Sequence, residues 1–185
     1  MHPEQLHSVL QRFMDAAMED VHTVTVGRIE EYDGHDTRRA TVLPLVRVWL
    51  STGEVVPHKP ITDVPVVFPS TASAGVILPV KRGDLVLLVF AEQGIGGFLQ
   101  SKTKDPVDAD GPSKFAFHDC IAIPGVFPFA QAPKISVPDG AVGVLCGKTS
   151  IILEDSKFTV TDGSGNKIES SSSKITVNGH LEVLK

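Results

Sequence analysis

The C-terminal part of the chain repeats one short pattern, which constrains the fold more than any other feature of the sequence. From Pro138 onward, short runs of apolar and β-branched residues have centres that recur every seven to nine residues. Turn-forming residues separate these runs, as in DGSGN at 162–166 and Asn178-Gly179. The spacing is too short for long hairpins and predicts a β-helix or a similar solenoid.

This tail is not expected to fold as a single chain. Its apolar side chains are too few to offset the conformational entropy of ordering it, and such short strands would leave their edges open to water. Three chains wrapped about one axis would cover each other's edges and share a dry core. We therefore predict a homotrimer with a triple-stranded intertwined β-helix over residues 138–185. The predicted trimer core consists of Ile151, Leu153, Phe158, Val160, Ile168, Ile175, Val177, Leu181 and Val183.

Residues 1–20 have the periodicity of one amphipathic helix. Its apolar face carries Leu6, Leu10 and Phe13, and polar residues surround this face. A helix that precedes a complete barrel is not needed to close it. We therefore expect Leu6, Leu10 and Phe13 to bind another protein.

Between residues 21 and 100 the pattern changes to β-strands. Apolar runs at 24–29, 40–50, 64–68, 75–78, 84–91 and 97–100 alternate with turn formers, and no helical pattern lies between them. About five strands in this length favour an OB-type five-stranded barrel. Residues 101–137 are predicted to be a polar linker followed by a Phe-rich segment that closes one end of the barrel. The fold class is therefore mainly β.

The charge and cysteine content exclude several classes of function. The chain has 17 Lys and Arg against 22 Asp and Glu, a net charge of -5, which disfavours nucleic-acid binding. Two cysteines outside any metal-ligand spacing predict neither a disulfide framework nor a zinc site, and they fit synthesis in a reducing cytoplasm. The longest apolar runs are far shorter than a spanning helix needs.

Three short motifs have a possible chemical reading and a simpler structural one. His118 and Cys120 could form a nucleophilic pair, but a buried inert thiol is favoured for Cys120. Residues 162–166 lack the ligand spacing of a calcium loop and are better explained as a tight turn. Residues 94–97 (GIGG) are glycine-rich, yet no helix is expected to follow them, so a simple loop is favoured over a phosphate site.

Three aromatic residues could form the stacking platform of an oligonucleotide-binding OB face. They are Trp49, Phe68 and Phe90, and they lie in runs rich in Val and Leu without interleaved Lys or Arg. Packing in the core is favoured for all three.

Several segments taken in order resemble a known family. They are VGRIEEYD, ATVLPLV, DVPVVFP, LPVKRGDLVLLVFAEQGIGGFLQ and FHDCIAIPGVFP, followed by the repetitive tail. This order resembles the central spike, or baseplate assembly protein V, family of contractile-tailed bacteriophages. The resemblance implies an OB-type domain seated on a trimeric tail hub and a β-helical needle that punctures the bacterial outer membrane when the sheath contracts.

The resemblance also implies where the protein works and with what. We expect a structural protein of the virion baseplate, without enzymatic activity or cofactor, that is made in the host cytoplasm. Its expected partners are two more copies of itself, the hub and tube proteins, and transiently the outer membrane. The alternatives are an OB-fold module for nucleic acid or glycan and an enzyme that uses His118 and Cys120.

The end of the tail departs from the family pattern. Some members end in a His-x-His pair that holds an iron ion on the threefold axis, whereas this tail has only His180. A solvated loop histidine is favoured over a metal ligand there, and no metal site is predicted. Because strands that end at Val183-Leu184-Lys185 would leave an apolar, unpaired end, we expect a separate small tip protein to cover it.

Overall fold

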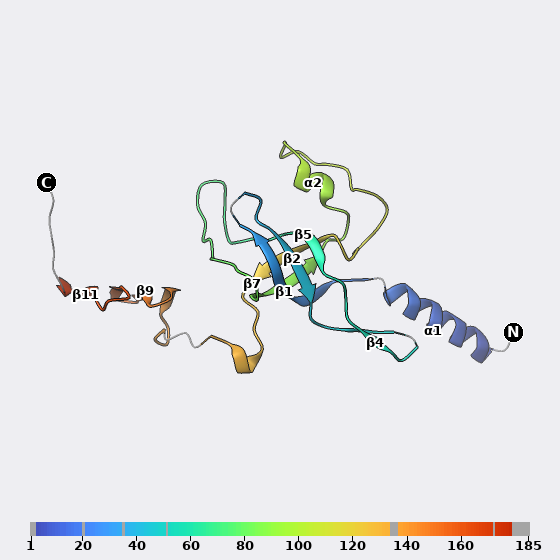
Figure 1. The fold of residues 1–185 in the computed structure, drawn as a ribbon, viewed down its shortest axis with the longest axis horizontal. Helices are drawn as coiled ribbons and strands as arrows, with labels where there is room; N and C mark the ends of the chain where they lie inside the picture. Colours follow the sequence, from blue (N-terminus) through green and yellow to red (C-terminus); the bar gives the residue numbers. More distant parts are fainter. Residues whose placement is uncertain are drawn as a thin grey trace. The chain divides into compact units, whose positions relative to one another are not determined.

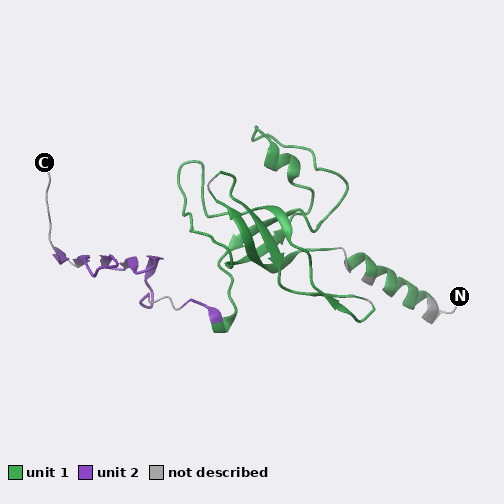
Figure 2. Ribbon diagram, in the orientation of Figure 1, with its two compact units in different colours: residues 1–130 green, residues 131–185 purple. Residues whose placement is uncertain are grey.

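The structure is a computed structural model (Figure 1) that describes residues 3–19, 21–34, 36–50, 52–133, 137–171 and 173–178. It divides into two compact units. Unit 1 comprises residues 1–130 and unit 2 comprises residues 131–185 (Figure 2). The described part is mainly β, with few helices, as the sequence predicted.

The predicted N-terminal helix is confirmed as α1 (Pro3–Glu19). Proline suits the first turn of a helix, where its missing N–H has no intrahelical partner. The apolar side chains of α1 are exposed, with accessible fractions between 49% and 72%; they are Leu6, Val9, Leu10, Phe13, Met14 and Met18. The helix therefore presents an apolar face to its surroundings.

Unit 1 is built on one antiparallel sheet with the strand order β5-β2-β1-β6-β7. The sheet curls until its two edge strands approach each other: the Val67 N–H donates to the Ala122 carbonyl at 3.0 Å, and Val66 forms a parallel bridge with Ala122. The result is a barrel-like sheet, seen near the centre of Figure 1. Its strands are β1 (Val24–Asp33), β2 (Arg39–Pro44), β5 (Ile61–Pro65), β6 (Leu85–Phe90) and β7 (Cys120–Pro124).

The concave side of this sheet holds the core of unit 1. Alternation along β6 shows the pattern: Val86, Leu88 and Phe90 are buried while the residues between them are partly exposed. Gly27 lies close to the neighbouring strand, since a Cβ there would come within 2.5 Å of Val42 Cγ1. The most deeply buried large side chains are Ile29, Val42, Val64, Val86, Leu88 and Cys120.

The structure corrects three strand predictions in unit 1. Residues 97–100 are not a strand but belong to the short helix α2 (Gly96–Gln100), and the fifth strand is β7, from the segment that was expected only to close the barrel. The run 75–78 forms no strand and contributes only a bridge between Gly75 and Ser70. An apolar run becomes a strand only where a neighbour offers a hydrogen-bonding ladder, which sequence patterns do not reveal.

The third correction concerns residues 40–50, which were expected to form one strand. The pairing of β2 with β1 ends at Pro44, opposite Gly27. The chain then enters a separate two-stranded ribbon, in which β3 (Val48–Trp49) pairs with β4 (Val55–Val56). Proline cannot donate to a ladder, so a strand end at Pro44 is physically reasonable.

Unit 2 is a second antiparallel sheet, a meander with the order β12-β11-β10-β9-β8. Four strands contain residues predicted for the trimer core, β8 was not foreseen, and Leu181 and Val183 lie outside the described residues. The strands are β8 (Val142–Cys146), β9 (Thr149–Glu154), β10 (Lys157–Thr161), β11 (Lys167–Ser171) and β12 (Lys174–Asn178). A short 3₁₀ turn, η1 (Phe129–Gln131), precedes them. The trimeric β-helix stays a prediction that a single chain does not test.

Candidate functional site: the two faces of the C-terminal sheet

One face of the unit 2 sheet is apolar across all five strands, apart from Ser170. The strand register aligns one row of five residues across the sheet: Val144, Ile151, Val160, Ile168 and Val177. The neighbouring row is formed by Val142, Leu153, Phe158, Ser170 and Ile175. We call these two rows the apolar face. Most of its side chains are exposed, and Ile175 reaches an accessible fraction of 67%.

The apolar face contains seven of the nine residues predicted to form a trimer core. They come from β9 to β12, and side-chain alternation brings all seven to the same side of the sheet. The other two, Leu181 and Val183, lie outside the described residues, as does His180. Val142 and Val144 were not among the predicted core residues, although their alternation with Gly143 and Leu145 was an available signal.

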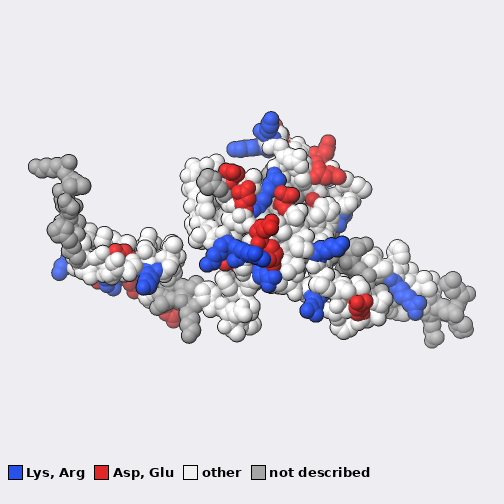
Figure 3. All heavy atoms as spheres, viewed as in Figure 1, with Lys and Arg blue, Asp and Glu red and all other residues white. Residues whose placement is uncertain are grey.

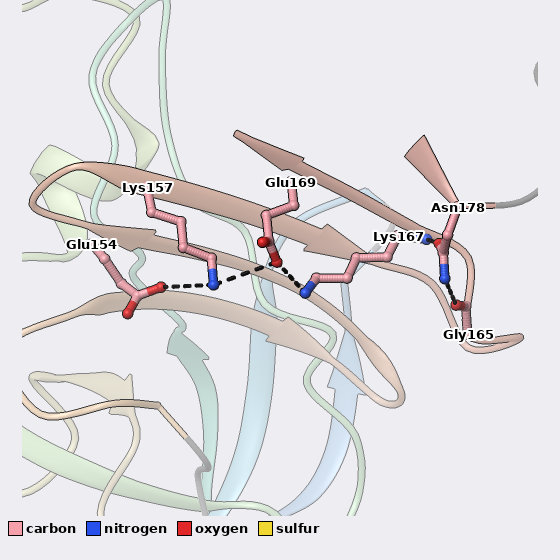
Figure 4. Close-up of polar contacts among 6 residues, drawn as sticks. All are labelled: Glu154, Lys157, Gly165, Lys167, Glu169 and Asn178. Atoms are coloured by element: carbon pink, nitrogen blue, oxygen red, sulfur yellow. Dashed lines mark hydrogen bonds and ion pairs between the residues drawn. The ribbon is translucent and has the colours of Figure 1, made fainter. Parts of the chain in front are cut away.

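The opposite face of the same sheet carries a ladder of charged side chains, which we call the charged face (Figure 4). Lys157 lies 4.0 Å from Glu154 and 3.4 Å from Glu169, and Lys167 also pairs with Glu169. The hydrogen bond from Lys167, followed by that from Lys157, holds the pKa of Glu169 below its usual value. Thr159, directly opposite Glu169 in the register, is buried. Long side chains therefore cover this face, whereas the apolar face is bare.

Asparagine and aspartate side chains secure the turns of this sheet. Asn178 accepts a hydrogen bond from the Lys167 N–H and donates one to the Gly165 carbonyl, which ties β12 to the turn before β11 (Figure 4). Within that turn, Asp162 Oδ1 accepts the N–H groups of Ser164 and Asn166, each at 2.8 Å. The Asn166 side chain also donates a hydrogen bond to Asp162. This bond contributes most to lowering the pKa of Asp162, and the backbone bonds contribute further. The prediction of a tight turn is confirmed.

The pair of His118 and Cys120 does not have the features of a nucleophilic site. Both line a pocket of about 380 Å³, but the His118 side chain is 79% exposed whereas Cys120 lies in the core. Burial, and secondarily the charge of Asp119, raises the pKa of the Cys120 thiol to about 12. The prediction that Cys120 is buried is confirmed, and a thiol with a raised pKa is a poor nucleophile at neutral pH.

The glycine-rich segment at 94–97 differs from the prediction in one respect, because helix α2 begins within it, at Gly96. The Gly97 N–H is not free for a ligand: it donates to both carboxylate oxygens of Asp110, at 2.9 and 2.8 Å. A Cβ at Gly96 would approach Asp110 Oδ2 to 2.3 Å. A larger residue at Gly96 would therefore require the Asp110 side chain to move.

The three candidate stacking aromatics are not brought together. Phe68 and Phe90 are buried in the core of unit 1, as predicted, but the core prediction for Trp49 is wrong. Trp49 lies on the β3–β4 ribbon with 72% of its surface exposed. On the face of unit 1 in Figure 3, Lys and Arg side chains lie among Asp and Glu rather than in a continuous basic stripe.

An aromatic cluster at one end of the barrel-like sheet was not foreseen. His58 stacks on Phe117 with ring centroids 4.5 Å apart, and His22 contacts both Phe117 and Phe90 at 5.0 and 5.4 Å. Burial, followed by the proximity of His22, lowers the pKa of His58. These rings come from segments far apart in the sequence, so no local pattern could have indicated the cluster.

Comparison with known protein families gives one match. Residues 26–125, just over half of the chain, match the family described as phage protein Gp138 N-terminal domain. No curated protein matches the chain. The matched range begins at the third residue of β1 and extends just past β7, so it covers the barrel-like sheet except for the first two residues of β1. Within the described residues, neither helix combines the length and the apolar character needed to span a bilayer.

Proposed function

This chain belongs to the Gp138 N-terminal domain family of phage proteins, and from that premise we propose that it is a trimeric central spike of a contractile tail. The family supports a structural role in a phage and a place in the virion. In this proposal the protein lies at the baseplate, where it caps the tail tube and punctures the outer membrane when the sheath contracts. The resemblance described above also supports this assignment.

The observation that carries the proposal is the apolar face of unit 2. A meander of strands of five or six residues, bare on one side, cannot bury its own apolar residues. Moving each of these side chains from water into a core stabilises by about 1.5–3 kcal/mol. Three copies, each turning this face toward a common axis, would form a three-sided prism with the charged faces outward.

The barrel-like sheet supports an OB-type domain as the base of the spike. Its first three strands form an antiparallel meander, and its last strand meets the third through the parallel bridge of Val66 and Ala122. This connectivity supports a five-stranded Greek-key barrel of the OB type. In the proposed spike, this domain sits on the hub and the prism projects from it.

A prism of this kind would act mechanically. Sheath contraction pushes the needle, and the interlocked chains transmit the force because unfolding one chain would expose the strand edges of the others. The outward charged face would keep the needle hydrated until it meets the membrane. No catalytic step is needed, and the protonated thiol of Cys120 agrees with a non-enzymatic role.

The hub contact is assigned to the exposed face of α1. Leu6, Leu10 and Phe13 are all at least 49% exposed in this chain, and an exposed apolar stripe on a helix is a common docking element. A separate tip protein at the C-terminal end completes the proposed set of partners. The residues that would contact it, 179–185, lie outside the described part of the chain.

The alternative functions have less support. A binding module for nucleic acid would place aromatic rings and cations on one exposed face, but Phe68 and Phe90 are buried and Trp49 stands apart from them. An enzyme that uses His118 and Cys120 would need a thiolate, which burial of the thiol opposes.

The proposal is tested by solution mass and by location in the particle. Light scattering of the purified chain should give three times 19.8 kDa, and the trimer should resist SDS without heating. Gold-labelled antibody should bind tail ends of the phage that encodes the chain. A concentration-independent monomer would exclude the prism, and absence of the chain from tails would exclude the spike.

A further inference from the structure

A pocket of about 210 Å³ lies beside the aromatic cluster of unit 1, and we call it the Arg47 pocket. Its lining brings together Arg47, from the segment between β2 and β3, and two histidines, His22 before β1 and His58 between β4 and β5. The two imidazole rings lie 6.3 Å apart between centroids. Thr23 and Thr25 line the same pocket. All five residues carry side-chain hydrogen-bond donors, and they come from three segments of the chain.

The charged and ring donors of this pocket have no acceptors of their own. Within the part of the chain that the structure describes, the side chains of Arg47, His22 and His58 form neither a hydrogen bond nor an ion pair. Other arginines of unit 1 do pair with carboxylates; they are Arg28, Arg39 and Arg82. Unpaired donors that line one recess together indicate a place for an anion.

The surroundings of the pocket also favour a negative ligand. Its described lining contains no carboxylate, and the lining residues besides the five donors are Val21, Val24, Val46, Phe90 and Phe117. Charged or titratable residues close to these in the sequence are not part of that lining; they are Glu54, Lys59, Glu92, His118 and Asp119. Asp20 lies outside the described residues. The described pocket is thus locally basic, although the chain as a whole has a net charge of -5.

The number of donors indicates which anion suits the pocket. The planar guanidinium of an arginine matches two oxygens of either a carboxylate or a phosphate. A carboxylate has only those two oxygens, whereas five donor residues line this recess. A phosphate group has more acceptor oxygens and a higher negative charge, so it can accept from several of these residues at once.

We propose that the Arg47 pocket binds a phosphate group, with Arg47 as its charged partner and His22 and His58 as further donors. A neutral imidazole donates one N–H and a protonated one donates two, so both forms can contribute. This site is separate from the apolar face of unit 2 and from α1. The inference therefore goes beyond the proposed spike function and does not depend on it.

Binding at this site should be coupled to protonation of His58. In the free chain, burial and then the proximity of His22 lower the pKa of His58, so the neutral ring is favoured. A bound dianion would favour the charged ring and raise this pKa again. Because binding and protonation then strengthen each other, the affinity should rise as the pH falls below the ordinary histidine range.

The first test titrates inorganic phosphate into the purified full-length chain at low ionic strength, followed by calorimetry. We expect saturable binding that Arg47→Gln weakens at least about tenfold, since hydrogen bonds to charged groups contribute strongly. Lys59→Gln is the matched control, because it removes the same charge beside His58 from a residue outside the pocket lining. It should change the affinity about twofold or less. No saturable binding, or equal losses in both variants, would overturn the proposal.

The second test measures the coupling to pH with sulfate, which stays a dianion where phosphate itself titrates. For the wild type we expect binding at least about threefold tighter at about pH 5.5 than at about pH 8. The ratio should be smaller for His58→Gln. An equal affinity at both pH values, or an unchanged ratio in His58→Gln, would show that the imidazole does not contact the anion and would overturn this assignment.

A third measurement identifies where the phosphate comes from. Vesicles of phosphatidylglycerol and phosphatidylcholine are sedimented with the wild type and with Arg47→Gln, and pure phosphatidylcholine vesicles serve as the control. Retention that is lost in Arg47→Gln would support a lipid headgroup as the source. With phosphate binding intact in solution, any other result would support a free phosphate or a small phosphate ester.

The outcomes separate this inference from the proposed function, because the titrations need no phage particle. A chain that is present in tails but does not bind phosphate would overturn the phosphate site and leave the spike intact. A chain that binds phosphate through Arg47 but is absent from tails would do the reverse.

Discussion

The two sheets of this protein have the same number of strands, but one buries its apolar side chains within the chain and the other leaves them exposed. In unit 1, the sheet curls until β5 and β7 meet, and residues such as Leu88 are fully buried within one chain. In unit 2, the strands stay in a simple meander and the apolar face remains bare. A sheet can thus bury its apolar side chains either by curling around them within one chain or by associating with another surface.

The difference follows from the order of the strands and from the length of β1, since the other strands of both sheets have five or six residues. Strand β1 has ten residues and pairs with both β2 and β6, so it can bend around a core. The strands of unit 2 have five or six residues and connect only to their sequence neighbours. Unit 1 should therefore have a stability of its own, whereas the stability of unit 2 should depend on the concentration of the chain.

The largest expected effect comes from a charge placed on the apolar face. Ile151→Lys should prevent association, because burying an unpaired ammonium in a shared core costs several kcal/mol per chain. Light scattering should then fall from three times 19.8 kDa to 19.8 kDa. Ser150→Lys is the matched control, since Ser150 is the adjacent residue on the charged face. An unchanged mass for Ile151→Lys would mean that this face is not a subunit interface.

A cavity in unit 1 should be the next largest effect and should not depend on concentration. Leu88→Ala removes a fully buried side chain and should lower the free energy of unfolding of unit 1 by about 2–5 kcal/mol. Leu87→Ala, on the outer side of the same strand, should cost much less. Thermal unfolding followed at several protein concentrations measures both. If the midpoint of the Leu88→Ala transition shifted with protein concentration, the stability of unit 1 would depend on association, and unit 1 would not fold on its own.

A smaller effect should appear as a pH dependence confined to unit 1. The pKa of His58 is lowered in the folded chain, so folding favours the neutral ring. The stabilisation is complete above the unfolded value of 6.5 and is lost as the pH falls from there toward the folded pKa. Thermal midpoints of the wild type should therefore fall more between pH 7 and pH 5 than those of His58→Gln. Equal slopes for both proteins would contradict this assignment.

The smallest effect is expected on the charged face of unit 2. Glu169→Gln removes the carboxylate that pairs with Lys157 and Lys167, but these groups are near the solvent and such pairs contribute little. We expect a slight fall in the unfolding midpoint of unit 2, a difference that shrinks at high salt, and no change in mass. A loss of association comparable to that of Ile151→Lys would show that the two faces have been assigned the wrong way round.

Much of this architecture could be predicted from local patterns. The spacing of apolar residues in α1 and the turn formers at 162–166 both determine local conformation over a few residues. The predicted helix and tight turn are therefore both found in the structure. The same holds for Cys120, whose apolar neighbours indicated burial. Alternation along β9 to β12 likewise placed seven predicted core residues on one face.

Other features depended on contacts between distant segments. Residues 97–100 have the composition of a strand. In the structure the Gly97 N–H donates to the Asp110 carboxylate, and the segment forms part of α2 instead. The fifth strand is β7 because β6 offers it a ladder, from Val86 to Phe90. Trp49, in a run rich in Val and Leu, is exposed because the sheet pairing ends at Pro44 and the chain leaves the core.

The sequence by itself therefore determined which segments are helical or extended and which side of each strand is apolar, because those properties follow from backbone sterics and periodicity over a few residues. Only the tertiary structure decided which strands pair, which apolar residues are covered and which are left bare. Those outcomes depend on hydrogen-bonding partners and packing surfaces that are far away in the chain. The exposure of Trp49 is a feature that only the fold could reveal, whereas the apolar face of unit 2 was indicated by the sequence and the structure adds that it is exposed in one chain.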